Sequence, residues 1–193
     1  MSKLRQILLL SFIFCFGVVE SSYRRHRRPN LIQRIEMGLN RIWSHVGKKI
    51  CPEQYDLYAG DGGPFCYKII TEFCKNWTSA RELCLAEGAD LMTFTEKNFQ
   101  EFREIIKDLY NIHAFECGPY AWVGATDATT DSVWLLVTGA RLVDNSVMWA
   151  TGEPGLGSSG KNCGILDGAN LDFYMADENC EREAIPICQL ILG

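Results

Sequence analysis

The sequence predicts an α+β domain in which two helices flank antiparallel sheets, with a long irregular loop region and several disulfide staples. Three observations lead to this prediction. The first half of the globular part contains two helical segments with capping signals at their starts. The second half contains short apolar runs separated by turn residues. Eight of the nine cysteines follow residue 50, an even number typical of exported, disulfide-bonded domains.

The first 21 residues have the order of a secretory signal peptide. Lys3 and Arg5 precede an apolar run from Ile7 to Val19, and small and polar residues follow near Ser21. The apolar run has 13 residues, whereas a membrane-spanning helix needs about 20. We therefore expect residues 1–21 to be cleaved and the mature protein to be secreted and extracellular. An uncleaved signal anchor is the alternative.

Residues 22–50 form a basic amphipathic segment. Residues 1–50 hold ten Lys or Arg and two acids, a balance of +8, while residues 51–193 hold nine against 22, a balance of −13. Apolar residues recur at spacings of three and four, which is typical of an amphipathic helix: Leu31, Ile35, Leu39, Ile42 and Val46. We expect self-association or contact with anionic surfaces here. A dibasic processing site, a solvated leader and packing on its own domain are the alternatives.

Residues 51–193 are long enough for one domain with an apolar core. A strand is predicted from Phe65 to Phe73. Ser79 with Glu82 is a capping box for a first helix that ends at Gly88 and turns Ala80, Leu83 and Cys84 inward. Thr93 with Glu96 would cap a second helix, whose apolar face consists of Phe99, Phe102, Ile106 and Leu109.

The second half of the domain loses helical periodicity. Strands are predicted from Ala121 to Ala125, from Val133 to Val137 and from Ile185 to Leu190. Between Gly152 and Asp172 the chain holds six glycines and few bulky residues. So long an irregular stretch inside a compact domain indicates a functional loop.

Together these segments resemble a C-type lectin-like domain of the long form over about Cys51 to Gln189, as found in invertebrate immune lectins. The resemblance depends on the shared order and spacing of many short pieces. In chain order they are Cys51-Pro52, Cys66-Tyr67, Trp77 to Cys84, Trp122 to Asp127, Trp134, Val137-Thr138-Gly139, Trp149, Gly152-Glu153-Pro154, Asn162-Cys163, Cys180 and Ile187-Cys188. Under this resemblance Trp122, Trp134 and Trp149 pack in the framework.

The resemblance implies four disulfides. It pairs Cys84 with Cys188, Cys163 with Cys180 and Cys51 with Cys66, which leaves Cys74 and Cys117 for a bridge outside the usual three. A zinc site is the rival interpretation of the cysteines, but the sequence has no CxxC pair and its three histidines are scattered. Asn76 lies in an Asn-Trp-Thr sequon between a predicted strand and helix, where we expect an accessible glycosylation site.

The resemblance also implies a calcium and sugar site, and this chain departs from its pattern. Sugar-binding relatives use a Glu-Pro-Asn triplet, a glutamate before the third core cysteine and an Asn-Asp pair, and here these read Glu153-Pro154-Gly155, Lys161 and Ala176-Asp177. Only Glu153 and Asp177 keep a ligating side chain, although calcium takes six to eight oxygens. We expect no calcium at this position, and an ion pair of Lys161 with Glu153 or Asp177 instead. Asp127 and Asp131, with Asn162 nearby, match an auxiliary calcium position.

These residues predict a binding protein rather than an enzyme. The leading hypothesis is a secreted protein of innate immunity that recognises carbohydrates or microbial surfaces through Glu153, Pro154, Lys161, Asn162 and Asp177. Phe173 and Tyr174 would offer a stacking face for a sugar, or else pack in the core. The alternative is a calcium-independent domain that binds a protein ligand. The acidic domain argues against a nucleic-acid partner, and His113, the domain's only histidine, lies in no catalytic motif.

Overall fold

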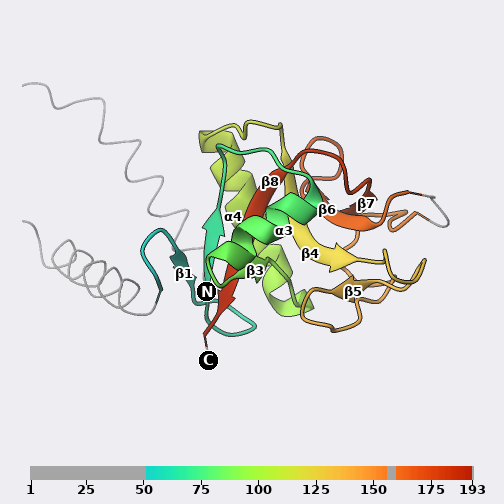
Figure 1. The fold of residues 1–193 in the computed structure, drawn as a ribbon, viewed down its shortest axis with the longest axis horizontal. Coiled ribbons are helices and arrows are strands. Elements are labelled where there is room, and N and C mark those ends of the chain that lie inside the picture. The colour runs from blue at the N-terminus through green and yellow to red at the C-terminus, as the bar shows by residue number, and fades with distance from the viewer. Residues whose placement is uncertain (1–50, 156–159, 193) are drawn as a thin grey trace, which may run out of the picture. The chain divides into compact units, whose positions relative to one another are not determined.

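The computed structural model of the chain describes residues 51–155 and 160–192 (Figure 1). The predicted signal peptide and the basic amphipathic segment, residues 1–50, lie outside the described residues. No helix in the described ranges is long and apolar enough to cross a membrane.

Eight strands and two helices make up the described domain. The strands are β1 (Asp56–Tyr58), β2 (Phe65–Ile69), β3 (Asp90–Leu91), β4 (Tyr120–Thr126), β5 (Leu135–Leu136), β6 (Cys163–Asp167), β7 (Tyr174–Glu178) and β8 (Ile185–Ile191), and the helices are α3 (Trp77–Ala86) and α4 (Glu96–Ile112). The main sheet has the order β1-β2-β8-β4-β6-β7, with β3 beside β8 and β5 beside β4. The predicted α+β class is confirmed.

One strand pair departs from the predicted antiparallel sheets. β8 runs antiparallel to β2 but parallel to β4, so the sheet is mixed. The pairing of β2 with β8 brings an early strand and the last strand of the domain together, with Phe65 opposite Ile191. Once β8 is fixed in that direction, its other edge meets β4 in parallel. Sequence periodicity carries no information on this choice of neighbour.

Neither helix begins at its predicted cap: α3 begins earlier and α4 begins later. In α3 the N-cap is Asn76, whose side chain accepts from the backbone N–H of Ser79 at 2.9 Å, so the capping box at Ser79 was wrong by three residues. In α4 the cap is Thr95, which forms a capping box with Asn98 rather than the predicted pair of Thr93 and Glu96. Short polar residues crowd both starts, and any of them suits an N-cap.

Two strands and the loop also differ from expectation. β2 ends at Ile69 instead of Phe73, whose side chain is exposed, and β5 covers only Leu135–Leu136 of the run from Val133 to Val137. The expected irregular stretch from Gly152 to Asp172 contains β6, which pairs with both β4 and β7. Its buried Ile165 and Leu166 supply core contacts that the surrounding glycines concealed in the sequence.

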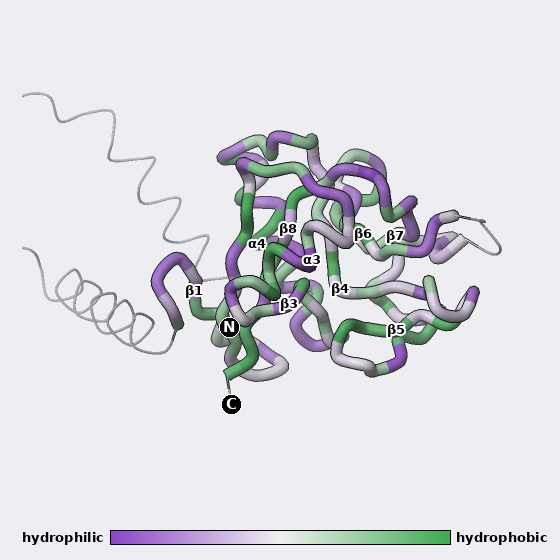
Figure 2. Tube along the Cα trace, in the orientation of Figure 1, coloured by the Kyte–Doolittle hydropathy of each residue, from purple (hydrophilic) through white to green (hydrophobic). Residues whose placement is uncertain are grey.

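The core lies between the sheet and the two helices. Phe99, Phe102 and Ile106 of α4 are buried as predicted, whereas Leu83 of α3 is only partly covered. Around Phe102 gather Tyr58, Phe65, Tyr67 and Phe94, with ring centroids 4.9–6.0 Å from its own. Figure 2 shows hydrophobic residues along β8 and hydrophilic ones in many of the surrounding loops. Trp122, Trp134 and Trp149 are buried, in agreement with a framework role.

The structure contains the four disulfides that the resemblance implied: Cys51–Cys66, Cys74–Cys117, Cys84–Cys188 and Cys163–Cys180. Their Cα–Cα distances, 5.2 to 5.8 Å, suit unforced bridges. The bridge from Cys84 to Cys188 spans 104 residues and fastens α3 to β8. All eight cysteines of the domain are thus committed, which leaves none of them for zinc.

Candidate ligand-binding site

A shallow hollow, open to solvent and enclosing about 30 Å³, lies where the loop after β4 and the long segment between β5 and β6 approach the end of β7. It brings together predicted residues from both the main and the auxiliary calcium positions. The lining residues are Asp127, Asp131, Ser132, Trp134, Asp144, Pro154, Gly155, Lys161 and Asp177. Glu153 and Asn162 lie beside it without lining it. Sequence reasoning missed Asp144, which has no signal beyond being one acid in a turn-rich segment.

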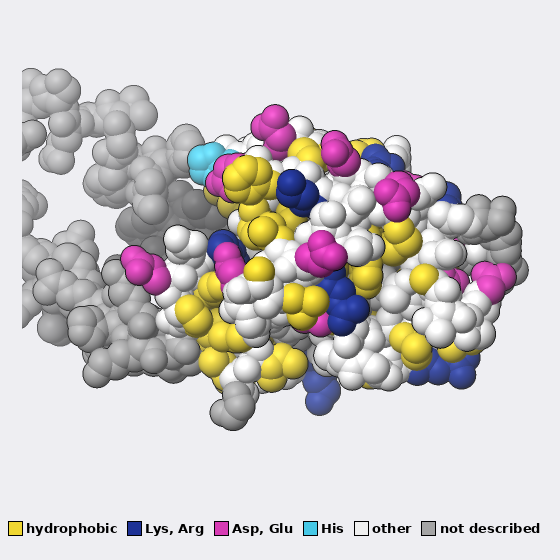
Figure 3. All heavy atoms as spheres, in the orientation of Figure 1, with side chains coloured by type: hydrophobic (Ala, Val, Ile, Leu, Met, Phe, Trp, Pro, Cys, Tyr) yellow, Lys and Arg dark blue, Asp and Glu magenta, His cyan; other side chains and the backbone are white. Residues whose placement is uncertain are grey.

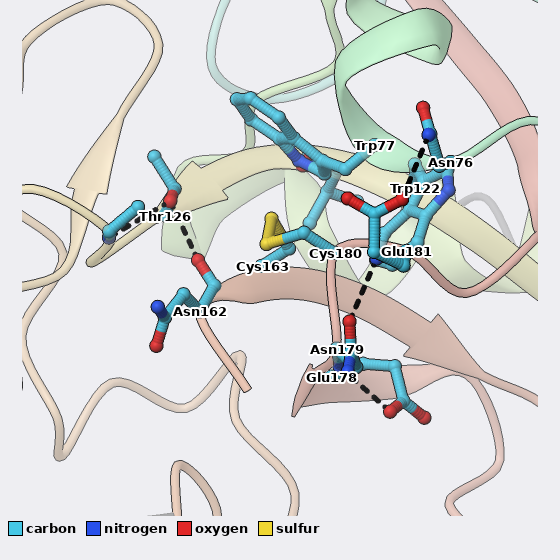
Figure 4. Close-up of a disulfide and its surroundings, with 12 residues drawn as sticks. Asn76, Trp77, Trp122, Thr126, Asn162, Cys163, Glu178, Asn179, Cys180 and Glu181 are labelled. Carbon is cyan, nitrogen blue, oxygen red and sulfur yellow. Dashed lines mark hydrogen bonds between the residues drawn. A yellow bond between two sulfur atoms is a disulfide. The ribbon is translucent and has the colours of Figure 1, made fainter. Parts of the chain in front are cut away.

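The Cys163–Cys180 bridge fixes the base of this region (Figure 4). It joins the start of β6 to the turn after β7. Just before Cys163, the backbone carbonyl of Asn162 accepts from Thr126 Oγ1 at 2.6 Å and from the backbone N–H of Asp127 at 3.2 Å. Asn162 therefore holds the loop after β4 through its main chain.

Asp177, 4 % exposed, connects three segments of the hollow. Its Oδ2 accepts from the backbone N–H of Gly155 at 2.9 Å, and its Oδ1 lies 3.5 Å from Lys161 Nζ. The ion pair predicted for Lys161 is thus present with Asp177. The Asp177 side chain is 3 % exposed and that of Lys161 is 46 % exposed. A buried carboxylate is therefore matched by a cation that reaches in from solvent.

Glu153 is a carboxyl group in an unfavourable place for a charge. Burial raises the pKa of Glu153 above its usual range, and the neighbouring carboxylate of Asp177 raises it further, while the backbone of Asp177 and the charge of Lys161 oppose this. Its Oε2 is buried without a hydrogen-bond donor. The carboxyl group of Glu153 therefore keeps its proton to a higher pH than a solvated glutamate does.

Asp127 presents a second carboxylate with an unused oxygen. Its residue is 6 % exposed, its Oδ2 accepts from the backbone N–H of Ser132 at 2.9 Å, and its Oδ1 has no hydrogen-bond partner. Asp131 and Asp144 line the same hollow from exposed positions. Within the described residues, no three His, Cys, Asp or Glu side chains come close enough to hold a metal ion together.

The residues at the main position do not fit the calcium ion that the resemblance implies. Gly155 has no side-chain donor, and Ala176, 6 % exposed, points a methyl group into the core. Lys161 places an ammonium where a ligand would stand. Two carboxyl groups and a cation cannot supply the oxygens that calcium requires.

The two aromatic residues proposed as a stacking face are packed instead. Phe173, 3 % exposed, lies over Gly168, and Tyr174 has the guanidinium of Arg103 4.2 Å from its ring centroid. Arg103 also donates to the backbone oxygen of Asp172 at 2.8 Å, which holds this turn against α4. The stacking hypothesis was wrong, and the packing alternative is correct.

Asn76 lies away from the hollow and has a structural role of its own. Besides capping α3, its Nδ2 donates to Glu181 Oε2 at 3.3 Å (Figure 4). The side chain is half-buried. Attachment of a glycan to Nδ2 would replace the Glu181 contact and leave the capping oxygen in place.

Comparison with known proteins identifies a family with this fold. The model of the lectin C-type domain matches residues 74–190. The human "C-type lectin domain family 4 member D" is 25 % identical over 199 residues, covering 95 % of this chain and 85 % of that protein. The cow carbohydrate-recognition domain of CD23, solved in the presence of an oligosaccharide, has a TM-score of 0.57 at 21 % identity, covering 74 % of this chain and 97 % of that chain.

A calcium-independent type II antifreeze protein has a TM-score of 0.58 at 18 % identity, covering 75 % of this chain and 96 % of that one. At such identities the structural likenesses show the fold alone. The matched family model, in contrast, spans more than half of the sequence and all the elements from α3 to β8. This chain therefore belongs to the family of C-type lectin domain proteins.

Proposed function

We propose that the protein is secreted and recognises glycans, such as microbial-surface polysaccharides, through the hollow, with no calcium ion at the main position. The observation that carries this proposal is the Lys161–Asp177 pair, which occupies the place of a calcium ligand set. A role in innate immunity would follow from binding of this kind. The lectin family and the oligosaccharide present with its cow relative support the ligand class.

The proposal requires that the loop keeps its shape without an ion. Asp177 supplies that support, because the N–H of Gly155 and the ammonium of Lys161 both reach its carboxylate. An intraprotein ion pair and a hydrogen bond to a charged group thus do work that a divalent ion would otherwise do. The described part of the surface presented to a ligand is accordingly held in place without an ion.

Binding rather than catalysis is the expected activity. C-type lectin domains are generally non-enzymatic, and His113, the one histidine in the described part, is an exposed residue at the end of α4 outside the hollow. A general base has to lie within hydrogen-bond reach of its nucleophile. A screen for hydrolase turnover should therefore give no signal above a heat-denatured sample.

A protein ligand is the second candidate, and one observation favours it. Val143 and Val147 are 48 % and 56 % exposed on either side of Asp144, which lines the hollow. Exposed apolar side chains close in sequence to a residue of a binding site are typical of surfaces that contact proteins. The same side chains also suit the apolar face of a sugar, so the two candidates need an experiment.

The experiment is a glycan array probed with the secreted full-length chain, once with calcium and once with chelator. We expect binding of some glycans with equal strength in both conditions. Substitution of Asp177 by Asn should weaken it, whereas His113→Ala, outside the hollow, should not. Binding abolished by chelator and restored by calcium would overturn the proposal for the main position. Absence of any glycan binding would leave the protein-ligand candidate.

Secretion and glycosylation belong to the same proposal. Expression in a cell with a secretory pathway should deliver the chain to the medium with residues 1–21 removed. A mass decrease on treatment with an N-glycosidase would show that Asn76 is occupied. Retention of the intact chain in the membrane fraction would favour the uncleaved signal anchor.

A further inference from the structure

We infer that the hollow selects saccharides that carry free ammonium groups, that is, unacetylated amino sugars, over their neutral and acidic counterparts. This inference rests on the proposed glycan-binding function and names the ligand class of the same site. It depends on the charges that line the hollow, on one buried oxygen without a partner, and on the kind of cation that such a site suits.

The hollow is acidic beyond what its own cation balances. Four carboxylates line it, from Asp127, Asp131, Asp144 and Asp177, against the single ammonium of Lys161. Lys161 is engaged by Asp177, and none of the ion pairs among the described residues involves the other three acids. On the face shown in Figure 3 the acidic side chains are dispersed. Convergence of three unbalanced carboxylates on one hollow therefore creates a local field that attracts cations.

Asp127 gives an independent indication. It is 6 % exposed, and its Oδ1 lacks the hydrogen bond that buried carboxylate oxygens normally have. A ligand that donates a hydrogen bond to such an oxygen gains binding free energy, and a charged donor gains the most. A ligand with an N–H donor and a positive charge supplies both, and a neutral hydroxyl supplies only the first.

An organic ammonium suits these acids better than a metal ion does. Calcium needs six to eight oxygens within about 2.6 Å, and no three acidic side chains in the described part are gathered for that purpose. An ammonium has three donors, and it can reach separated carboxylates directly or through water. The hollow encloses only about 30 Å³, so it admits a small group such as an ammonium, while the sugar ring that carries this group would lie across its open mouth.

A matched pair of ligands tests the inference directly. Glucosamine oligomers and N-acetylglucosamine oligomers of equal length share their ring and linkage, but only the former are charged at mildly acidic pH. The secreted full-length chain should bind the charged oligomer at least about tenfold more tightly in chelator. That preference should shrink as salt rises, because exposed carboxylates are screened.

Two variants with equal charge change separate the hollow from the rest of the acidic domain. Asp131→Asn with Asp144→Asn should reduce the preference by roughly three- to tenfold, since exposed ion pairs are each worth up to about 1 kcal/mol. Asp108→Asn with Glu104→Gln, on α4, which contributes nothing to the hollow, should leave the preference unchanged. Both pairs are exposed, so the fold should tolerate them.

The outcomes distinguish this inference from the proposed function. Binding of neutral glycans with no preference for amines would overturn the inference and leave the proposed function standing, whereas absence of all glycan binding would defeat the proposed function. Oligolysine binding as tightly as the amino sugar would show that charge alone is read, which overturns the saccharide class. Loss of amine binding in chelator would assign the acids to a metal ion and also overturn the inference.

Discussion

Restoring the missing calcium ligands should give the protein a measurable response to calcium that the natural sequence lacks. The change is Gly155→Asn, Lys161→Glu and Ala176→Asn, which recreates the ligand pattern of sugar-binding relatives around Glu153 and Asp177. The measurement is the thermal midpoint of unfolding in 1 mM calcium and in chelator. A ligand that binds only the folded state stabilises it by an amount fixed by its concentration and dissociation constant.

The expected magnitude follows from the position of Lys161. Its Nζ lies 3.5 Å from Asp177 Oδ1, so an ion about 2.4 Å from that oxygen would be within about 6 Å of the ammonium. At an effective dielectric of 20 the repulsion is about 5 kcal/mol, and solvent screening of the half-exposed lysine reduces this to about 2–3 kcal/mol. Affinity would then fall from the millimolar range of extracellular sites to tens of millimolar or weaker.

These affinities predict distinct thermal shifts. The natural chain should gain less than about 0.1 kcal/mol in 1 mM calcium, too little to move the midpoint measurably. The restored variant, with a dissociation constant of about 0.1–1 mM, should gain about 0.4–1.4 kcal/mol, or roughly 1–4 °C. A calcium shift of several degrees in the natural chain that Asp177→Asn removes and Asp131→Asn preserves would refute the reasoning.

Two further predictions concern Asn76 and Glu153. Asn76→Ala removes the cap of α3 and should lower the free energy of unfolding by about 1 kcal/mol. Thr78→Ala destroys the sequon but keeps the cap, so it should abolish glycosylation with little effect on the midpoint of thermal unfolding. Equal midpoints for the two variants would contradict the capping role of Asn76. Because burial raises the pKa of Glu153 in the folded state, its ionisation opposes folding as pH rises from the ordinary value of 4.5 through the folded-state pKa. Chemical denaturation should therefore show that Glu153→Gln is more stable than the natural protein at neutral pH, and this advantage should vanish at acid pH. A variant that is less stable than the natural protein at pH 7 would contradict the raised pKa of Glu153.

The sequence predicted the fold where signals were redundant. The apolar face of α4 repeats through Phe99, Phe102 and Ile106, so the helix was predicted correctly although its N-cap was not. The start of β6 was missed because Gly160 and Gly164 surround it in a stretch that reads as a loop. Strand direction was missed because β4 and β8 meet through tertiary contacts that leave no local pattern.

The residues of the candidate site also fall into those that the sequence predicted and those that it missed. Lys161, Gly155 and Ala176 were identifiable because the resemblance to C-type lectin-like domains assigns a calcium ligand to each of these positions. For Lys161 an ion pair with Glu153 or Asp177 could be anticipated from charge, and the structure shows the pair with Asp177. Asp144 and the unpartnered oxygen of Asp127 could not, because they depend on how separate loops meet. The choice between stacking and packing for Phe173 was left open for a similar reason, since only the structure shows its ring lying over Gly168.

The pairing of β2 with the last strand, β8, has a practical consequence for presenting the protein. β1, β2 and the C-terminal end of β8 lie at one end of the domain in Figure 1, and the loops that form the hollow lie at the other. A C-terminal tag or surface anchor therefore leaves the hollow open to solvent. Copies held side by side through their ends would point their hollows the same way, so that a repeating polymer meets many weak sites at once and is retained far longer than any single sugar.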